Sequence, residues 1–377
     1  MKCGIVLGTR PEIIKLAPVI WLLRQSSLPY AVIHTGQHYS YEMDTSFFET
    51  LELDPPDVNL ATGADGASHG VQTGAMFGQL EAAFADLAVD RVLVHGDTNS
   101  TLAGALVGAK LNLPVGHVEA GLRSFDRTMP EEVNRVVADH VASQLYAPTQ
   151  AAMANLAREG LSGTLCGNTI VDTIEAMRER LSLRADWQRL GLMPGEYMFL
   201  TLHRQENVDN SARLASIVAG LSLIAQRIQL PIVFSMHYRT RDRLQRTGLL
   251  GKLADIPRLT VLHPPIGLLE SLALQSEARL VLTDSGGLQE EACVLGTPCV
   301  TLRENTERPE TLEIGANVLG GYRPQTMLAA VEAMLDRRGC WPNPFGDGRA
   351  AARCVAAIMA RPDLNPGELV LPVIGGV

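Results

Sequence analysis

This chain of 377 residues has no tract of basic residues, no apolar run long enough to cross a bilayer and no paired-cysteine motif. Its formal net charge is −9, and because no basic tract offsets that charge, nucleic acid is not expected as a main partner. The missing long apolar run argues against a membrane-spanning helix. Since Met1-Lys-Cys3 leads directly into an apolar strand, we expect no signal peptide and a cytoplasmic location.

Metal-ligand and redox motifs are missing as well. The chain contains no D-x-D, no H-E-x-x-H and no tight cluster of histidines, so no metal site is predicted. The cysteines show no C-x-x-C spacing and several fall in apolar runs, which indicates buried free thiols. They are Cys3, Cys166, Cys293, Cys299, Cys340 and Cys354.

Two nucleotide-binding fingerprints are also absent. No G-x-G-x-x-G occurs, which argues against a nicotinamide-dependent oxidation, and no G-x-x-x-x-G-K-[ST] occurs, which argues against a P-loop nucleotidase. We therefore expect no cofactor. What the chain does have is an apolar fraction of 46% beside a charged fraction of 19%, which is typical of a soluble globular protein with ample core material.

Apolar runs of strand length alternate with helical patterns along almost the whole chain. In the first half, the predicted strands are 3–7, 31–34, 91–95, 115–118, 145–147 and 164–166, and the predicted helices include 98–111 and 131–143. In the second half, the predicted strands are 198–202, 232–235, 259–262, 280–283 and 299–302. Continuous apolar strands separated by helices are typical of parallel sheets covered on both faces.

Two such series in a chain of this length predict an α/β fold of two doubly wound, Rossmann-like domains facing a cleft. We place the domains at residues 1–170 and 171–377, with the C-terminal helix as a candidate to pack back on the first domain. The charged, loosely patterned segment 178–195 suits a linker. Ligands of open parallel sheets bind outside the carboxyl ends of the strands. The candidate ligand-binding residues all follow strand ends: Arg10, Asp97, Glu119, His203, His237 and Ser285.

A first candidate anion site is Gly8-Thr-Arg-Pro-Glu12, which follows the first predicted strand and begins a helix. Pro11 fits the first turn of that helix. Arg10 and Lys15 would lie near its N-terminus, an unfavourable end for cations unless an anion binds there. The alternative is that both side chains are solvated on a surface helix.

A second candidate anion site lies in the stretch from Thr283 to Glu291, which reads as a strand end, a Ser285-Gly-Gly287 turn and a helix. The unpaired N–H groups and positive end of such a helix suit a phosphate. Glu291, in the second turn, could reach a ribose diol. Glycine can also serve tight geometry alone, but the matching N-terminal site favours a diphosphate.

Carboxylates follow two neighbouring strands of the first half. Asp97 and Glu119 end their strands, while Glu131 and Glu132 open a helix that carries Arg135 one turn later. Asp97 could instead cap the next helix, and Glu132 with Arg135 could be a surface pair. Glu119 is harder to explain structurally, because a carboxylate that closes an apolar strand needs a buried partner or a ligand.

His203 follows the strand 198–202 in the same way, although a lone histidine there has a structural role more often than not. Together, the residues indicate cations for a diphosphate, several carboxylates and histidines, and no redox cofactor. Nucleotide-sugar chemistry fits that set.

The ordered motifs resemble those of the non-hydrolysing UDP-N-acetylglucosamine 2-epimerases, which share the two-domain glycosyltransferase-B architecture. The resemblance covers nearly the whole chain. The motifs that carry it are Gly8–Lys15, Thr35-Gly-Gln-His38, Gly96-Asp-Thr98, Gly116–Arg123, Pro130–Arg135, Leu202-His-Arg204, Glu206-Asn207, Thr283–Glu291 and Thr306–Glu310.

The resemblance implies Asp97, Glu119 and Glu131 as the catalytic acids, with Arg135 and His203 in support. The substrate-binding residues that we take from it are Arg10, Lys15, His237, Ser285, Gly286, Gly287, Glu291 and Arg308. The implied reaction breaks the C1–O bond of the sugar first, which makes the C2 proton removable. UDP and 2-acetamidoglucal would then be the bound intermediates.

In that scheme Arg10, Lys15 and the Ser285 turn stabilise the departing UDP. We expect Asp97 and Glu131 to transfer the protons, with Glu119 orienting the others or sharing charge. The assignment among the three carboxylates stays open at this point.

The chain departs from the commonest bacterial pattern in three places. Tyr39-Ser-Tyr-Glu42 stands where many bacterial members carry an Arg-Glu-Met-Leu-Asp-Gln run, part of which contributes to an activating second substrate site. Allosteric activation is therefore not implied here. His237-Tyr-Arg239 replaces a usual His-Pro-Arg, and His263-Pro-Pro265 stands where an acidic residue and one proline are more usual, which could alter nucleotide or sugar fit.

Other functions remain open from the sequence. A glycosyltransferase of the same architecture would need an acceptor site, and a nucleotide-sugar sensor would bind without turnover. A 2-epimerase of the hydrolysing type or of a modified UDP-hexosamine would carry related motifs. The expected partner is a UDP-sugar, and the resemblance further implies a homodimer that serves polysaccharide biosynthesis.

Overall fold

A computed structural model describes residues 1–37, 41–63, 67–339, 341–360 and 364–374. His38, Tyr39, Ser40 and Cys340, which figure in the sequence argument, lie outside the described residues. The chain divides into two compact units, and each is described here by itself. Unit 1 comprises Met1–Glu179 and Phe345–Val377, and unit 2 comprises Arg180–Pro344. The domain boundaries predicted from the sequence, 1–170 and 171–377, stay a prediction.

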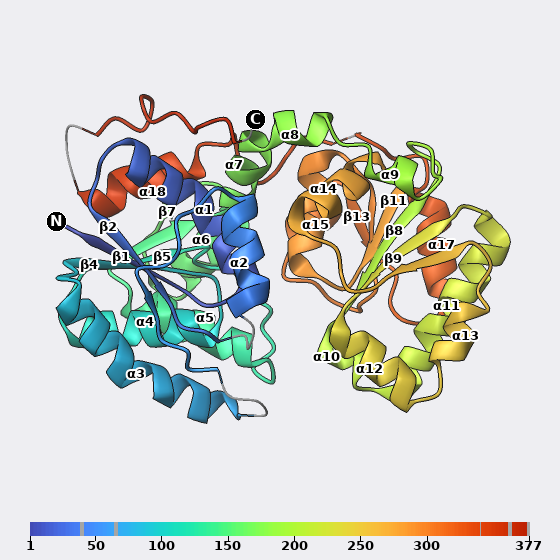
Figure 1. The fold of residues 1–377 in the computed structure, drawn as a ribbon, viewed down its shortest axis with the longest axis horizontal. Helices are drawn as coiled ribbons and strands as arrows, with labels where there is room; N and C mark the ends of the chain where they lie inside the picture. Colours follow the sequence, from blue (N-terminus) through green and yellow to red (C-terminus); the bar gives the residue numbers. More distant parts are fainter. Residues whose placement is uncertain (38–40, 64–66, 340, 361–363, 375–377) are drawn as a thin grey trace. The chain divides into compact units, whose positions relative to one another are not determined.

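Unit 1 is a parallel sheet with helices on both faces (Figure 1). The strands are β1 (Cys3–Leu7), β2 (Tyr30–His34), β3 (Val58–Asn59), β4 (Arg91–His95), β5 (Val115–Val118), β6 (Gln144–Ala147) and β7 (Thr164–Leu165). Their order in the sheet is β3-β2-β1-β4-β5-β6-β7. The helices are α1 (Arg10–Gln25), α2 (Tyr41–Thr50), α3 (His69–Asp86), α4 (Asn99–Lys110), α5 (Pro130–Val141), α6 (Gln150–Arg158), α7 (Thr169–Ala176) and α18 (Ala350–Met359).

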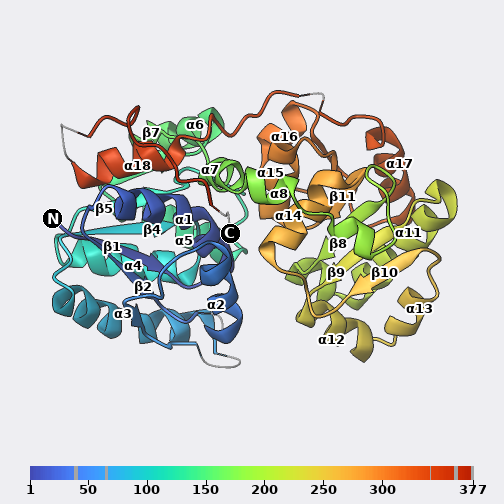
Figure 2. The same cartoon turned by 45° about the horizontal axis from the view of Figure 1, so that its top comes forward.

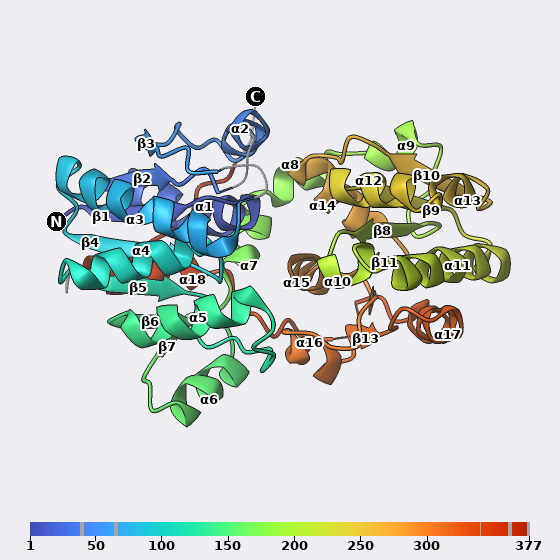
Figure 3. The ribbon, with the colours of Figure 1, turned by 90° about the horizontal axis from the view of Figure 1, so that it is seen from below.

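The two faces of this sheet carry different helices. Helices α3, α4 and α5 lie side by side on one face (Figure 3). Their buried residues, such as Met76, Leu80 and Ala103, form a core with Val6 and Val92 of the strands. On the other face, α1 packs against α7 and against the C-terminal helix α18 (Figure 2). The last helix of the chain is thus part of the first sheet's cover.

Unit 2 repeats the design with its own sheet, in the order β10-β9-β8-β11-β12-β13. The strands are β8 (Met198–Leu202), β9 (Ile232–Met236), β10 (Leu259–Leu262), β11 (Leu280–Thr283), β12 (Cys299–Thr301) and β13 (Asn317–Leu319). The helices are α9 (Asp186–Arg189), α10 (Gln205–Val208), α11 (Ser211–Ile228), α12 (Tyr238–Arg246), α13 (Leu250–Ala254), α14 (Leu268–Glu277), α15 (Gly286–Leu295), α16 (Pro309–Glu313) and α17 (Pro324–Met334). The short helix α8 (Arg178–Ser182) spans the boundary of the units.

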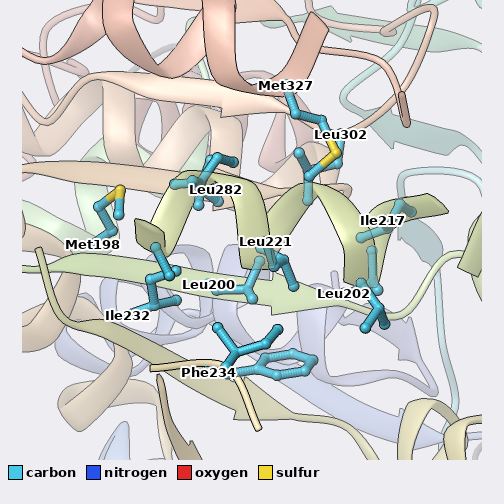
Figure 4. Close-up of a cluster of buried hydrophobic side chains, with 14 of the residues drawn as sticks. Met198, Leu200, Leu202, Ile217, Leu221, Ile232, Phe234, Leu282, Leu302 and Met327 are labelled. Atoms are coloured by element: carbon cyan, nitrogen blue, oxygen red, sulfur yellow. The ribbon is translucent and has the colours of Figure 1, made fainter. Parts of the chain in front are cut away.

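Strand β8 shows why the central strands of unit 2 read as continuous apolar runs. Successive side chains of a strand point to opposite faces of a sheet. Met198, Leu200 and Leu202 enter the core beneath α11 and α17 (Figure 4). Phe199, between them, enters a second core on the opposite face. Because both faces are covered, every position of the strand is apolar or half-buried.

The predicted α/β class is confirmed, and most predicted strands agree with the structure to within one residue. The short strands β3 and β13 were not predicted. In both sheets the strand order reverses beside the strand that begins the unit, between β1 and β4 and between β8 and β11. Ligands bind at that point in open parallel sheets, at the carboxyl ends.

Candidate active site

The turn after β1 begins α1 with Thr9 as N-cap and Pro11 in the first turn. Arg10 is half-buried, and its guanidinium carbon lies 5.3 Å from the centroid of the Phe47 ring. Such a cation–π contact restrains the guanidinium but leaves its charge intact. The predicted placement of Arg10 at the N-terminal end of a helix is therefore confirmed, whereas its role as a diphosphate ligand stays a prediction.

Glu12, two residues further on, is buried and accepts several hydrogen bonds. We did not single it out from the sequence. Its carboxylate accepts hydrogen bonds from the Gly8 amide at 2.9 Å and from the hydroxyl groups of Thr9, Thr98 and Thr101 at 2.9, 2.6 and 3.1 Å. Burial raises the pKa of Glu12, and the hydrogen bonds from Thr98, Gly8 and Thr9 oppose that shift. The residue ties the turn after β1 to the turn after β4.

Lys15 and Glu119 form a buried ion pair at the carboxyl ends of β1 and β5. The Nζ atom of Lys15 donates to Glu119 Oε2, and both side chains are less than a tenth exposed. Nε2 of His95 lies 3.3 Å from the same oxygen. Glu119 has a φ of 69°, a conformation that costs a non-glycine residue on the order of 1 kcal/mol or more. The sequence left a buried partner or a ligand open for Glu119, and the structure shows buried partners.

Asp97 follows β4 and forms an ion pair with Arg135 of α5. The amide group of Asn134 donates to the Asp97 carbonyl oxygen at 3.0 Å, so α5 holds both the backbone and the side chain of Asp97. Thr98, and not Asp97, is the N-cap of α4, where its hydroxyl accepts from the Thr101 amide. The alternative interpretation of Asp97 as a helix cap is therefore wrong.

The pair of Glu132 and Arg135 is not a surface pair. Arg135 Nη1 donates to Glu132 Oε2 at 2.8 Å, and both residues are buried. Glu132 also accepts from the amide groups of Ser124 and Phe125, at 2.9 and 3.0 Å, and so fixes the loop before α5. Arg135 thereby bridges Asp97 and Glu132.

Glu131, the third proposed catalytic acid, is half-buried in the first turn of α5. Within the described part of the chain, its carboxylate has no hydrogen-bond or ion-pair partner. It differs in this from Asp97 and Glu119, each of which pairs with a cation. Its proposed role in proton transfer stays a prediction.

A buried network behind these carboxylates holds the two strand ends together. His117 Nε2 donates to the Gly96 carbonyl oxygen at 2.8 Å, and His117 Nδ1 contacts Asp139 Oδ1 at 2.7 Å. Asp139 Oδ2 accepts from the Gly121 amide at 3.1 Å and from Arg123 at 2.7 Å. Burial would raise the pKa of Asp139, but the His117 charge and hydrogen bond, followed by those of Arg123, lower it overall.

In unit 2, Asp284 organises the turns after β8 and β11. Its carboxylate accepts from the backbone amides of His203 and Arg204, at 3.0 and 2.9 Å, and from the Asn207 side chain at 3.1 Å. Ser285 follows as N-cap of α15, with its own amide bonded to Thr283 Oγ1 at 3.0 Å. No partner for the amides of Gly286 and Gly287 is found within the described residues, as expected for an anion site.

The two predicted histidines of unit 2 are neighbours. The ring centroids of His203 and His237 are 6.1 Å apart. His237 is exposed and caps α12, where its Nδ1 accepts from the Arg239 amide at 3.3 Å. Burial lowers the pKa of His203, and the charges of Arg204, Arg239 and Arg303 lower it further, against the opposing charge of Asp284. A largely neutral imidazole follows at neutral pH.

The remaining predicted residues of unit 2, Glu291 and Arg308, each contact a buried polar side chain. Glu291 is buried in the second turn of α15 and accepts from Gln275 Nε2 at 2.7 Å. Arg308 is buried and forms an ion pair with Glu290 of the same helix. Both contacts fix the side chains relative to α15. The proposed contacts of Glu291 with a ribose and of Arg308 with substrate stay predictions.

Within each unit, the structure thus gathers the predicted residues at the carboxyl ends of the strands. Unit 1 brings Lys15 to Glu119 and Arg135 to Asp97, and unit 2 brings His203 and Arg308 to the N-terminal end of α15. Sequence reasoning missed Glu12, His117, Asp139 and Asp284. Glu12, His117 and Asp284 lie within the quoted motifs and Asp139 lies shortly after one, but each also has partners from distant elements, which no local pattern reveals.

The family model of UDP-N-acetylglucosamine 2-epimerase matches residues 22–359 of this chain. The chain belongs to this family. The predicted resemblance and, at the level of the family, the predicted class of isomerase are therefore confirmed. The UDP-N-acetylglucosamine 2-epimerase of Methanocaldococcus jannaschii is 48% identical over 362 residues, which cover 94% of this chain and 98% of that epimerase.

Two further comparisons bear on the substrate and on the fold. The UDP-2,3-diacetamido-2,3-dideoxy-D-glucuronate 2-epimerase of Pseudomonas aeruginosa is 38% identical over 366 residues, covering 96% of this chain and 100% of that protein. A crystal structure of the Methanocaldococcus jannaschii epimerase in complex with UDP-GlcNAc and UDP matches with a TM-score of 0.90 at 47% identity, covering 96% of this chain and 100% of the other. The family of this chain therefore includes more than one sugar substrate.

Within the described residues, none of the helices combines the length and the hydropathy that a bilayer crossing needs. The same residues contain no group of three His, Cys, Asp or Glu side chains that could hold a metal ion. The cysteines that the structure describes are buried free thiols, as predicted.

Proposed function

We propose that this protein interconverts UDP-N-acetylglucosamine and UDP-N-acetylmannosamine by epimerisation at C2, without a cofactor. The observation that carries the proposal is the pair of carboxylates at neighbouring strand ends of unit 1, each held by a cation. Asp97 is held by Arg135, and Glu119 by Lys15. Arg135 holds Asp97 in place, as a general base must be held within reach of its proton, and the buried Glu119 adds a second fixed charge beside it.

In the proposed reaction, the C1–O bond breaks first and UDP leaves with the bonding electron pair. Arg10 and the amides of Gly286 and Gly287 stabilise the developing diphosphate charge. A carboxylate then takes the proton from C2, which leaves 2-acetamidoglucal. A second group returns a proton to C2 from the opposite face, and a UDP oxygen re-forms the bond to C1.

We assign the two proton transfers to Asp97 and Glu131 and an orienting or charge-sharing role to Glu119. The environment of each side chain supports this division. Glu119 is buried against Lys15 and His95, which suits a fixed charge. Asp97, at 33% side-chain exposure, and half-buried Glu131 are the more accessible of the three.

Incubation with UDP-N-acetylglucosamine in heavy water tests the proposal. Proton exchange at the base should place deuterium at C2 of the recovered nucleotide sugars, with UDP-N-acetylmannosamine accumulating to equilibrium. Activity that needs an added sugar acceptor, without deuterium at C2, would instead identify a glycosyltransferase. Tight binding without turnover would identify a sensor.

The hydrolysing alternative has its own readout in the same experiment. Water that reaches the glycal would release N-acetylmannosamine and UDP. We expect UDP-N-acetylmannosamine to be the main product. Free sugar that accumulates as fast as epimer would overturn the non-hydrolysing assignment.

A modified UDP-hexosamine is the second candidate substrate, and the 38% identity to the UDP-2,3-diacetamido-2,3-dideoxy-D-glucuronate 2-epimerase favours it as an alternative. The ratio of kcat/KM for the two nucleotide sugars decides between them. We expect UDP-N-acetylglucosamine to have the higher value, in keeping with the 48% identity to the Methanocaldococcus jannaschii epimerase.

We further propose a cytoplasmic homodimer that serves polysaccharide biosynthesis, as the family resemblance implies. Light scattering at micromolar concentration should give twice the mass of the chain, which is 40.7 kDa. Activity should survive dialysis against a chelator, since no metal takes part in the proposed chemistry.

A further inference from the structure

Arg204, which follows His203 after β8, differs from the other arginines at the N-terminal end of α15. Three side-chain atoms surround the position that a Cβ atom on Gly286 would occupy. Arg204 Nη2, Glu307 Oε2 and Arg308 Cζ lie 3.7, 3.8 and 3.9 Å from it. The guanidinium of Arg204 therefore lies against the turn that we propose to hold a diphosphate.

The neighbouring arginines are already paired with carboxylates. Arg303 donates to both oxygens of Glu307, at 2.9 and 3.0 Å, and also pairs with Glu206 at 2.6 Å. Arg308 pairs with Glu290. In the described part of the chain, no carboxylate lies within 4.0 Å of the Arg204 guanidinium, and its side chain makes no hydrogen bond.

The Nε atom of Arg204 is buried without a partner. A buried donor left unsatisfied costs roughly 1–3 kcal/mol, and more for a charged group. The backbone of Arg204 is nevertheless fixed, because its amide donates to Asp284 Oδ2 at 2.9 Å. The structure thus holds the Arg204 backbone in a defined place, and no described residue uses the hydrogen-bonding capacity of its guanidinium.

The negative charge of Glu307 accounts for Arg204 only in part. Glu307 lies at the same turn, and Arg303 meets it with a bidentate contact. Against the effect of burial, the hydrogen bonds from Arg303 hold the pKa of Glu307 well below its usual range, and the charges of Arg204, Arg303 and Arg308 add to this. Glu307 is therefore ionised and hydrogen-bonded to Arg303, while the Arg204 charge acts on it without an ion-pair contact among the described residues.

We propose that Arg204 binds the diphosphate of the nucleotide at the N-terminal end of α15 and stabilises it as it leaves the sugar. This inference rests on the proposed function, because it deepens the role of the same site. The planar guanidinium suits phosphate oxygens, which it can meet with two parallel hydrogen bonds. The amides of Gly286 and Gly287 would supply the remaining donors.

Isothermal titration with UDP and with uridine separates this role from a structural one. Arg204→Gln should weaken UDP binding about ten- to a hundredfold, the range expected for one charge-assisted contact. Binding of uridine should not change, because uridine carries no phosphate. Arg204→Lys keeps the charge but not the planar guanidinium. Its affinity for UDP should lie between those of the wild-type protein and Arg204→Gln.

The matched control is Arg246→Gln, which removes an exposed arginine of α12 that pairs with Asp242. It should leave UDP binding and thermal unfolding unchanged. Arg308→Gln should lower the unfolding temperature, because it leaves Glu290 buried without its cation. Arg204→Gln should leave that temperature near the wild-type value, since no carboxylate loses a close partner.

Equal losses of UDP and uridine affinity, with a lowered unfolding temperature, would overturn the inference and make Arg204 structural. Unchanged UDP affinity in Arg204→Gln would overturn it as well. Failure of the wild-type protein to bind UDP at all would instead overturn the proposed function. The two failures are therefore distinguishable in one set of titrations.

Discussion

At the scale of single residues, the site of unit 1 depends on which cation holds which carboxylate. Lys15 of α1 pairs with Glu119, and Arg135 of α5 pairs with Asp97. The sequence argument placed Lys15 with the diphosphate, and the structure adds a neighbour that no motif indicated. A lysine that neutralises Glu119 in the resting protein can still be close to a ligand, so both roles stay compatible.

The first prediction separates binding from chemistry at Asp97. Asp97→Asn keeps the shape of the side chain but removes the proton acceptor. We expect kcat to fall by a factor of about a hundred to ten thousand, with UDP affinity unchanged. Steady-state kinetics and titration with UDP measure the two quantities. Asp86→Asn, on the exposed side of α3, is the control. Near-normal turnover in Asp97→Asn would remove this residue from the mechanism.

The second prediction concerns the energetics of the Lys15–Glu119 pair. Lys15→Met leaves the Glu119 carboxylate buried without its cation, and we expect the free energy of unfolding to fall by about 3–5 kcal/mol. The double change Lys15→Met with Glu119→Gln removes the orphaned charge and should recover part of that loss. Urea denaturation measures both.

Lys110→Met, at the exposed end of α4, should change the free energy of unfolding by less than about 0.5 kcal/mol. If Lys15→Met were equally neutral, Glu119 would have to be satisfied by other groups, and the pair would lose its structural importance. A double variant that is less stable than Lys15→Met would show that the buried charge of Glu119 does not cause the loss of stability.

At the scale of elements, strand ends are predictable from the sequence, but the supports behind them are not. The apolar runs locate β4 and β5 and hence Asp97 and Glu119. The network that fixes those strand ends, through His117 and Asp139, joins a strand to the last turns of α5. Its spacing depends on how α5 crosses the sheet, which is a property of packing and not of local sequence.

Helix α18 shows a similar dependence on a distant residue. Its own N-cap, Arg349, makes no side-chain cap, and Asp172 of α7 takes that role by accepting from the amides of Ala350 and Ala351 at 3.2 and 2.9 Å. Burial nevertheless raises the pKa of Asp172 to about 7, against the effect of these hydrogen bonds. The C-terminal helix is thus held by a group that titrates near neutral pH.

The third prediction follows from that raised pKa. Between about pH 4 and pH 7 the folded state binds the Asp172 proton more tightly than the unfolded chain does, so this contribution to stability falls as the pH rises. Above pH 7 it is constant. From pH 5 to pH 8, the free energy of unfolding of the wild-type protein should fall by roughly 3 kcal/mol relative to Asp172→Asn, which lacks the titration.

Denaturant titrations of both proteins at pH 5 and pH 8 give this difference, and other titrating groups cancel in the comparison. In Asp172→Asn only one side-chain oxygen remains as an acceptor, whereas both carboxylate oxygens of Asp172 accept from backbone amides of α18. The variant therefore loses one of these two contacts. That loss should be the same at both pH values. A difference that does not change with pH would mean that Asp172 stays ionised in the folded protein.

At the scale of the whole molecule, the sequence reveals the repeated α/β pattern but not the path of the chain between the units. The runs at 198–202 and 280–283 predict β8 and β11 correctly. The division at Glu179 falls at the start of the segment 178–195 that the sequence indicates as a linker, whereas the division at Pro344 does not appear in any local pattern. The C-terminal helix was a candidate from the sequence to pack on the first domain, and α18 contacts α1 and α7 of unit 1.

The fourth prediction tests this division by dissecting the chain. Unit 2 is continuous and has its own core, so residues 180–344 expressed alone should unfold cooperatively in denaturant. Residues 1–179 lack α18, whose Val355, Ile358 and Met359 are buried, and each such side chain contributes about 1.5–3 kcal/mol. That loss is comparable with the whole stability of a typical domain. We therefore expect residues 1–179 to unfold without a cooperative transition, and an added peptide of residues 345–377 to restore one. Cooperative unfolding of 1–179 alone, unaffected by the peptide, would show that α18 only covers a unit that is already stable.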